Sequence, residues 1–382
     1  MFSNMKLNKI FLCFLALFIF GLSFNNLFAQ EIHDQYQGTF KAKIVDIIGE
    51  EEIKIGWSDN ISIYKNLEVK ILGGPQKNQT ATFKSDFPEI EEGDVVFLNY
   101  LVDISGIERY SIVNIDRTFQ IYLFFALFIF VIIIFGGFQG LRSLVALLGS
   151  FLAIFYILIP GILAGWNPLV ASFLVASAIL FAAIFFTHGF NRESLVAYVG
   201  TMISVGITGV LAWYAVGASN LSGFSDEAAV FLNFNTGGEL DFSGLLLAAI
   251  IIGILGVLDD IAVTQSAVVT ELFNSNKKIS RKEVYKRAMR VGKEHVGALV
   301  NTLVLAYTGT ALPLLLLFNI YDYEFTTVIN MEIFASEIIR TIIGSIGLVM
   351  TVPIVTSLAV FYLKDYKSKG GHSHSHGHSH SH

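Results

Sequence analysis

The 382-residue chain has one cysteine and six prolines, and only 15% of its residues are charged. Cys13 lies in the first 29 residues, so the rest of the chain cannot form a disulfide. The sequence also lacks a nucleophile–base arrangement, a phosphate-cradling glycine loop and a zinc-protease helix motif. It has no extended basic face with aromatic platforms. These absences argue against an enzyme and against a nucleic-acid-binding protein.

Apolar residues dominate instead. They make up 54% of the chain, which contains 34 Phe and 33 Gly, a composition that suits packed transmembrane helices. A membrane-spanning helix needs about 20 apolar residues. The sequence after residue 118 predicts about seven such segments: 119–138, 142–163, 168–187, 195–217, 243–272, 296–318 and 337–363. We therefore expect a polytopic α-helical membrane protein embedded in the lipid bilayer.

Basic residues are absent from every second loop. Segments 164–167, 218–242 and 319–336 contain no Lys or Arg, whereas the alternating loops and the C-terminal segment are basic. The positive-inside rule then places the C-terminus in the cytoplasm and residues 30–118 outside. With the signal segment described next, this predicts a multi-pass protein of the bacterial cytoplasmic (inner) membrane.

The N-terminus has the pattern of a secretory signal. Lys6 and Lys9 precede an apolar run, and Leu27-Phe28-Ala29 offers a cleavage site after Ala29. Leu27 is larger than the residue preferred at that position, so residues 1–29 are either a cleaved signal peptide or an uncleaved signal anchor.

Residues 30–118 predict a small extracytoplasmic β domain. Short runs with alternating or β-branched residues are separated by turn signals such as Gly73-Gly74-Pro75. The runs start at Phe40, Ile53, Ile61, Leu67 and Val95. Five or six strands in this length favour a compact, barrel-like fold, with the OB fold as one candidate. Assembly or partner docking and ligand binding both remain open as its role.

Two polar segments lie on the predicted cytoplasmic side. Residues 277–293 are strongly basic, and Ser280 followed by Glu283 predicts a capping box that starts an amphipathic helix on the membrane surface. The basic tail 364–382 is His-rich and can chelate Zn²⁺ or Ni²⁺. It is either a native metal-binding tail or an added tag. Its histidines are His372, His374, His376, His378, His380 and His382.

The most informative feature is a pair of adjacent carboxylates, Asp259 and Asp260, near the middle of the fifth apolar segment. A charge in a bilayer costs from a few to about ten kcal/mol unless it is paired, hydrated or protonated. Two neighbouring carboxylates cannot both ionise cheaply there, which suits a proton carrier. The alternative is a structural hydrogen-bonding pair between helices.

The helical period extends this site. One stripe combines small and polar residues that could line a water path: Gly253, Gly256, Asp260, Thr264, Ala267 and Glu271. Gln265 stands next to this stripe. Candidate partners on the last two segments are Asn301 and Thr308, which are seven residues apart and share a face, and Arg340 as a counter-ion. His188 and His295 lie at predicted helix ends and receive no role.

Three segments resemble the YibE/YibF-like family of membrane proteins, and the resemblance runs from the β domain through the whole membrane region. They are Gly253-Ile-Leu-Gly-Val-Leu-Asp259-Asp260, Gly297-Ala-Leu-Val-Asn301-Thr302-Leu-Val-Leu-Ala-Tyr307-Thr308-Gly309 and Ala335-Ser-Glu337-Ile-Ile-Arg340. This family has no well-defined biochemical activity, so the resemblance implies an architecture rather than a reaction.

Residues 243–363 are also similar, more weakly, to the proton-relay helices of resistance-nodulation-division exporters and SecD/SecF. That likeness implies proton uptake and release by Asp259 and Asp260. It also implies a homo-oligomer or a second membrane subunit, because this chain has about half of the usual helix set. No predicted helix supplies the lysine that those relays use.

Two hypotheses follow. The first is a proton-coupled transporter or export-assisting permease for an unidentified substrate, with a relay at the Asp pair. The second is a non-transporting envelope scaffold in which the Asp pair is structural and the β domain organises partners.

Overall fold

The computed structural model describes residues 36–54, 61–87, 90–102, 107–225, 227–320 and 323–364. The predicted signal segment and the histidine tract lie outside these residues. The chain divides into two compact units, Met1–Phe128 and Ile129–His382. Each unit is described by itself below.

The first unit contains a five-stranded antiparallel sheet with the order β3-β2-β1-β4-β5. Its long central strand, β1, pairs with both β2 and β4. The strands are β1 Tyr36–Lys54, β2 Ile61–Ile71, β3 Thr80–Ser85, β4 Val95–Val102 and β5 Glu108–Ile115. A β domain is confirmed. β1 and β2 each join two predicted runs, whereas β3 and β5 were not predicted.

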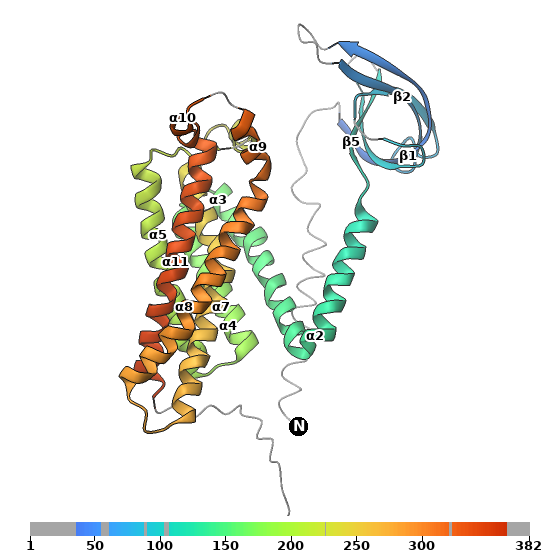
Figure 1. Cartoon of the computed structure of the whole chain (residues 1–382). Helices are drawn as coiled ribbons and strands as arrows, with labels where there is room; N and C mark the ends of the chain where they lie inside the picture. Colours follow the sequence, from blue (N-terminus) through green and yellow to red (C-terminus); the bar gives the residue numbers. More distant parts are fainter. Residues whose placement is uncertain are drawn as a thin grey trace, which may run out of the picture. The chain divides into compact units, whose positions relative to one another are not determined.

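The sheet is curled (Figure 1), and its strands enclose one apolar core. Alternate residues such as Ile44, Leu67 and Leu98 are fully buried, as the two-residue period of a strand requires. Two register shifts interrupt the pairing of β1 with β2, and such bulges increase strand twist. The rings of Phe83 on β3 and Tyr110 on β5 stack with centroids 6.0 Å apart. The sheet is therefore a half-barrel, and its relation to the OB fold stays a prediction.

An ion pair follows the last strand. Lys41 on β1 lies 2.6 Å from a carboxylate oxygen of Asp116. The hydrogen bond from Lys41, supported by Thr118, lowers the pKa of Asp116 to about 2. Asp116 therefore stays ionised at neutral pH, immediately before the first helix begins at Thr118.

The remaining elements are helical (Figure 1). They are α2 Thr118–Ala153, the π-helical turn Ile154–Leu158, α3 Ile159–Leu163, α4 Pro168–His188, α5 Arg192–Ala218, α6 Glu227–Asn235, α7 Phe242–Ser275, α8 Arg281–Thr310, α9 Leu312–Ile320, α10 Phe325–Ile329 and α11 Glu332–Tyr362. Asn or Asp side chains cap the starts of α4, α5 and α7, and Ser280 caps α8 by accepting from the Glu283 N–H. The predicted cap of α8 is confirmed.

Among the described residues, five helices are long and apolar enough to cross a membrane, or six if α8 and α9 form one span. The predicted total was about seven. The first two predicted segments form one run, Thr118–Leu163, interrupted at Gly137, whose φ of 53° is not helical. The helical unit is compatible with a multi-pass membrane protein.

The sixth predicted segment differs most from expectation. α8 is one continuous helix that includes most of the basic segment, so that segment is not a separate surface helix. At Ala311 the chain then bends by 70° into α9. Pro313 explains the bend, because it has no N–H to donate and its ring would clash with the carbonyl four residues earlier in a continuous helix.

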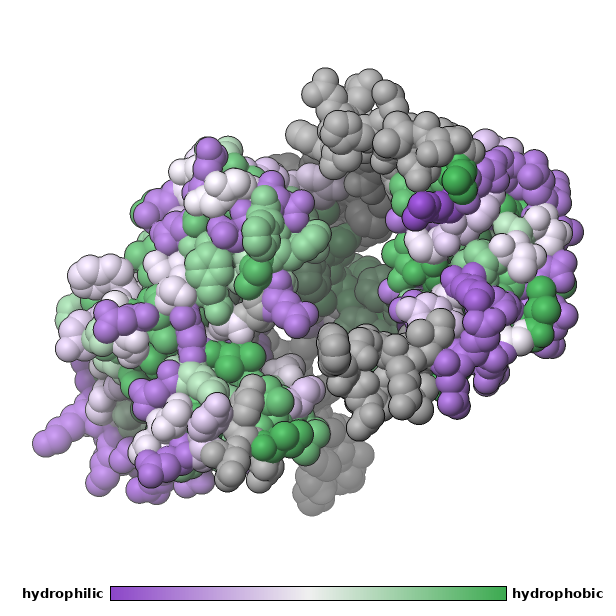
Figure 2. Space-filling view, turned by 90° about the horizontal axis from the view of Figure 1, so that it is seen from above, coloured by the Kyte–Doolittle hydropathy of each residue, from purple (hydrophilic) through white to green (hydrophobic). Residues whose placement is uncertain are grey.

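The polarity of the surface of the helical unit differs between its end and its sides. Viewed from the end that carries α9 and α10, polar and apolar residues are intermixed (Figure 2). Along the helices, large apolar side chains such as Leu174, Val210, Trp213 and Val349 are exposed. Such a surface suits contact with lipid chains.

α7 is the central helix and packs against α4, α5, α8 and α11. Its residues Ile250, Ile251, Ile254 and Leu258 are among the most deeply buried in the chain. α5 and α11 also approach closely, because glycines leave room for the facing helix. A Cβ on Gly200 would lie 2.6 Å from Val355 Cγ2, and one on Gly347 would collide with Thr208. Small residues therefore set the distance between these helices.

We expect Gly347→Ala to lower the free energy of unfolding by about 1–3 kcal/mol, because the new methyl group overpacks the α5–α11 contact. Gly217→Ala is the matched control, since no atom lies within 4 Å of its added Cβ. Reversible unfolding of the purified protein in mixed detergent micelles would measure both. If the two variants were equally stable, the contact at Gly347 would not limit how closely α5 and α11 pack.

Candidate functional site

The Asp pair lies on the central helix α7, in two different environments. Asp259 is half-buried, and its Oδ1 atom is buried without a hydrogen-bond partner among the described residues. Asp260 is exposed, and so is every other member of its predicted stripe, from Gly253 to Glu271. Apart from Gly253, which the Tyr307 hydroxyl of α8 approaches, the stripe is therefore an uncovered face of small and polar residues on an otherwise packed helix.

The pair sits at the middle of α7 but near the end of a neighbouring helix. α4 and α7 start level with each other, because a Cβ on Gly244 would lie 3.1 Å from Pro168 Cγ. The same number of residues separates Pro168 from His188 and Gly244 from Thr264. At 1.5 Å per residue, α4 therefore ends about 6 Å beyond Asp260. The aspartates are thus about one helical turn from the predicted cytoplasmic end of α4.

Two further titratable residues lie at this level: His188, which the sequence placed at a helix end without a role, and Glu193, which no sequence pattern singled out. His188, the last residue of α4, interacts electrostatically with both Asp260 and Glu193. Glu193 lies in the first turn of α5, and its backbone carbonyl is 3.4 Å from Ser266 Oγ on α7. The signal in the sequence is weak, since both residues appear only as charges in a short loop. The fold brings them to the same end as the Asp pair.

Gln265 joins three helices. It is 3% exposed, and its Nε2 donates to the Ala288 carbonyl of α8 at 3.0 Å and to Thr356 Oγ1 of α11 at 2.7 Å. Gly292 leaves room for it, because a Cβ there would lie 3.1 Å from Gln265 Oε1. The amide therefore fixes the register of α7 against two neighbours next to the Asp pair.

Of the two predicted partners on α8, Asn301 lies near the level of the aspartates and Thr308 does not. α8 runs antiparallel to α7, because Gly292 meets Gln265 and Tyr307 OH lies 2.7 Å from a Cβ on Gly253. Asn301 falls between these two contacts, near the level of Asp259, and is exposed. Thr264 is exposed as well. Thr308 lies farther along α8, on the wall of a separate hollow.

Arg340 is not brought to the Asp pair. α11 runs parallel to α7, and a Cβ on Gly344 would lie 3.1 Å from Ile254 Cγ2. Arg340 is one turn before Gly344, so it is level with about residue 250 of α7. That places it about 15 Å from Asp260 along the helix axis. Its ion pair is with Glu337 on its own helix, at 2.6 Å.

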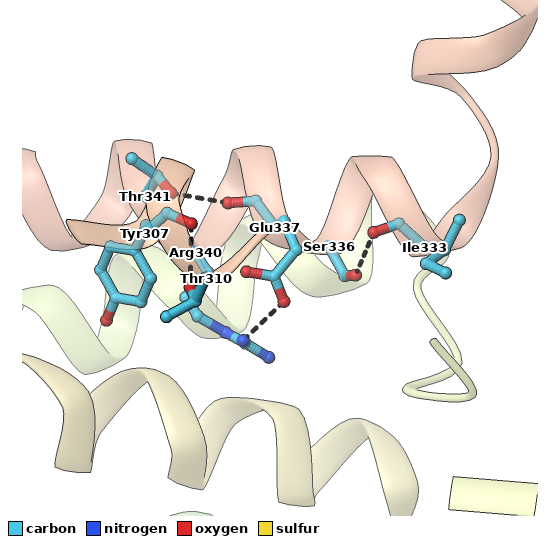
Figure 3. Close-up of polar contacts among 7 residues, drawn as sticks. All are labelled: Tyr307, Thr310, Ile333, Ser336, Glu337, Arg340 and Thr341. Carbon is cyan, nitrogen blue, oxygen red and sulfur yellow. Dashed lines mark hydrogen bonds and ion pairs between the residues drawn. The ribbon is translucent and has the colours of Figure 1, made fainter. Parts of the chain in front are cut away.

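Arg340 lines a hollow of about 580 Å³ between α8, α9 and α11. Tyr307, Thr310, Pro313 and Glu337 contribute to the same wall. In Figure 3 the Tyr307 hydroxyl, the Glu337 carboxylate and the Arg340 guanidinium point to the same side of α11. A second, more apolar hollow of about 410 Å³ shares Tyr307 and Glu337 with the first.

Metal binding finds no support within the described part of the chain, where no three His, Cys, Asp or Glu side chains form a group that could hold a metal ion. The metal prediction concerned the tract His372–His382, which lies outside the described residues. It stays a prediction.

The sequence model of one known family, described as YibE/F-like protein, matches residues 124–365. The chain belongs to the YibE/F-like family. No curated protein and no solved structure matches it.

The YibE/F-like match covers most of the helical unit, including the Asp pair, Gln265, Asn301 and the Glu337–Arg340 pair. It leaves out the half-barrel sheet, which ends at Ile115. The family assignment and the apolar helices together suggest a membrane protein.

We expect Gln265→Leu to lower the free energy of unfolding by about 1–3 kcal/mol, because it removes two interhelical hydrogen bonds from a buried position. Thr264→Val is the neighbouring control at an exposed position and should change stability by less than about 0.5 kcal/mol. The measurement is again unfolding in mixed micelles. A Leu variant as stable as the wild type would mean that Gln265 does not hold the three helices in register.

Proposed function

We propose that this YibE/F-like protein is a proton-coupled transporter or export-assisting permease of the bacterial cytoplasmic membrane, with Asp259 and Asp260 as its proton relay. The observation that carries the proposal is the buried Asp259 Oδ1 atom without a partner. A purely structural carboxylate would be held by donors, because leaving a buried polar atom unpaired costs about 1–3 kcal/mol or more. A carboxylate that takes up and releases a proton has a reason to remain unpaired.

Access for protons supports the same role. Asp260 lies on the exposed stripe of α7 and interacts with His188, about one turn from the end of α4. Protons would thus have a short route from Asp260 through His188 to the side that the basic loops predict to be cytoplasmic. Asn301, near the same level on α8, would orient one of the carboxylates. Arg340, about 15 Å from Asp260 along the helix axis, would not take part in this proton route.

The exposed stripe also bears on partners. A lipid-facing helix surface normally carries large apolar side chains, whereas small residues let helices approach closely. The face from Gly253 to Glu271 has no large apolar residue on its stripe. In our proposal a second copy of the chain or another membrane subunit covers this face and completes the proton path.

The orientation is the one that the basic loops predict, with the half-barrel outside the membrane and the C-terminus in the cytoplasm.

The test is proton flux into proteoliposomes under an imposed pH gradient, followed with an internal pH dye. We expect Asp259→Asn and Asp260→Asn each to lower the flux about tenfold or more, since an amide cannot carry the proton. Glu239→Gln, in the loop before α7, is the control and should conduct like the wild type. Asp259→Asn should not lower stability, because it removes an unpaired carboxylate.

Opposite results would favour the scaffold hypothesis. In that case Asp259→Asn would lose folded protein rather than flux, and wild-type proteoliposomes would conduct no better than empty ones.

A further inference from the structure

The hollow beside Arg340 has a structural cause that the proton relay does not explain. It opens where the chain bends by 70° between α8 and α9, which moves α9 away from the axis of α8. Tyr307 and Thr310 line it from α8, Pro313 from α9, and Glu337 and Arg340 from α11. Its volume of about 580 Å³ is in the usual range for small-molecule sites.

Arg340 has an unused donor in this wall. Its Nη1 donates to Glu337 Oε1 at 2.6 Å, but its Nε is buried and has no hydrogen-bond partner in the described part of the chain. A guanidinium presents five donors in a fixed planar fork and is suited to carboxylate and phosphate oxygens. The Nε itself is inaccessible, but 22% of the Arg340 side chain is exposed, so an acceptor oxygen in the hollow can reach the guanidinium beside its bond to Glu337.

The adjoining hollow is apolar. It shares Tyr307, Ala311, Leu314 and Glu337 with the first one, so the two are adjacent. Its wall consists mainly of Leu315, Phe318, Phe325, Phe334, Ile338 and Ile342. A wall that carries the Arg340 guanidinium and the Tyr307 hydroxyl, next to an aromatic and aliphatic wall, matches a molecule with an acidic head and an apolar chain.

We propose that the two hollows together bind an amphiphile whose phosphate or carboxylate headgroup lies at Arg340 and whose hydrocarbon chain lies among Phe318, Phe334 and Ile338. The Tyr307 hydroxyl is a further donor for the headgroup, whereas the Thr310 hydroxyl donates to the Tyr307 carbonyl at 2.9 Å. Binding stands on this geometry alone. The additional statement that such an amphiphile is the transported substrate rests on the proposed function.

A simpler reading treats Arg340 and Glu337 as an ordinary i,i+3 pair on one helix. That reading explains the ion pair but not the unpaired Nε or the hollow around it. The two readings also predict different effects of removing Glu337 on anion binding. If the pair is only structural, Glu337→Gln leaves anion binding unchanged or weakens it, because Arg340 loses the partner that orients it. An anion site would instead gain net positive charge and bind more tightly.

The experiment measures saturable binding of radiolabelled dodecyl phosphate to the full chain in phosphatidylcholine nanodiscs, without a proton gradient. We expect Arg340→Gln to weaken binding about tenfold or more, through loss of a charge-assisted contact. Glu337→Gln should tighten it several-fold. Arg142→Gln, which removes an arginine on α2 outside the hollow, is the matched control and should bind like the wild type.

Competition with unlabelled compounds shows whether binding requires both the phosphate headgroup and the hydrocarbon chain. Unlabelled dodecyl phosphate should displace the probe, whereas inorganic phosphate and dodecanol should each require at least about tenfold higher concentration. Equal competition by inorganic phosphate would assign the hollow to a free anion, and equal competition by dodecanol would remove the role of Arg340. Either result overturns the proposal, as does a weaker-binding Glu337→Gln variant.

These outcomes are independent of proton flux. A protein that binds dodecyl phosphate but conducts no protons would retain this inference and overturn only the proposed function. If Arg340→Gln does not fold, the direction of the change in Glu337→Gln still decides between the two readings.

Discussion

The constraint on which this structure depends is that polar groups inside apolar helices must find partners within the protein. The buried hydroxyls meet it locally: Thr201, Ser204, Thr208, Thr351 and Thr356 each donate to the carbonyl four residues earlier on their own helix. Gln265 meets it across helices. Within the described residues, only Asp259 Oδ1 and Arg340 Nε are buried side-chain atoms without a partner. The two exceptions mark the two candidate sites.

These sites lie at different levels of the helical unit. The Asp pair is near the end where α4 finishes, and Arg340 is about 15 Å away along the axis of α7. α8 passes both, with Asn301 at the level of the carboxylates and Tyr307 against Gly253 and the hollow. A shift of α8 along or about its axis would therefore change both sites. This is the physical basis on which a proton site and a ligand site in one chain could be coupled.

The contact between α7 and α8 sets the limits of such a shift. Gly253 and Gly292 lie against Tyr307 and Gln265, and the Gln265 amide ties α7 to α8 and α11. α5 and α11 are held together through Gly200 and Gly347 against Val355 and Thr208.

Much of this protein could be predicted from local sequence pattern. Apolar length predicted most of the long helices, the Ser280–Glu283 spacing predicted the start of α8, and strand alternation predicted a β domain. Asp259 and Asp260 stood out because charges are costly within apolar runs. These features depend on residues close together in the chain. The bend at Ala311 could also have been inferred, because Pro313 is a local signal.

Other features were decided only by tertiary structure. Helical period places Asp260 on a stripe, but only the contact of α4 with α7 shows that it lies near the end of α4. Arg340 looked like a counter-ion in the sequence, yet the level of α11 against α7 leaves it paired with Glu337 beside a hollow. The edge strands β3 and β5 likewise depend on their partners. In each case the deciding quantity is the register between elements distant in sequence, which packing sets and local pattern does not contain.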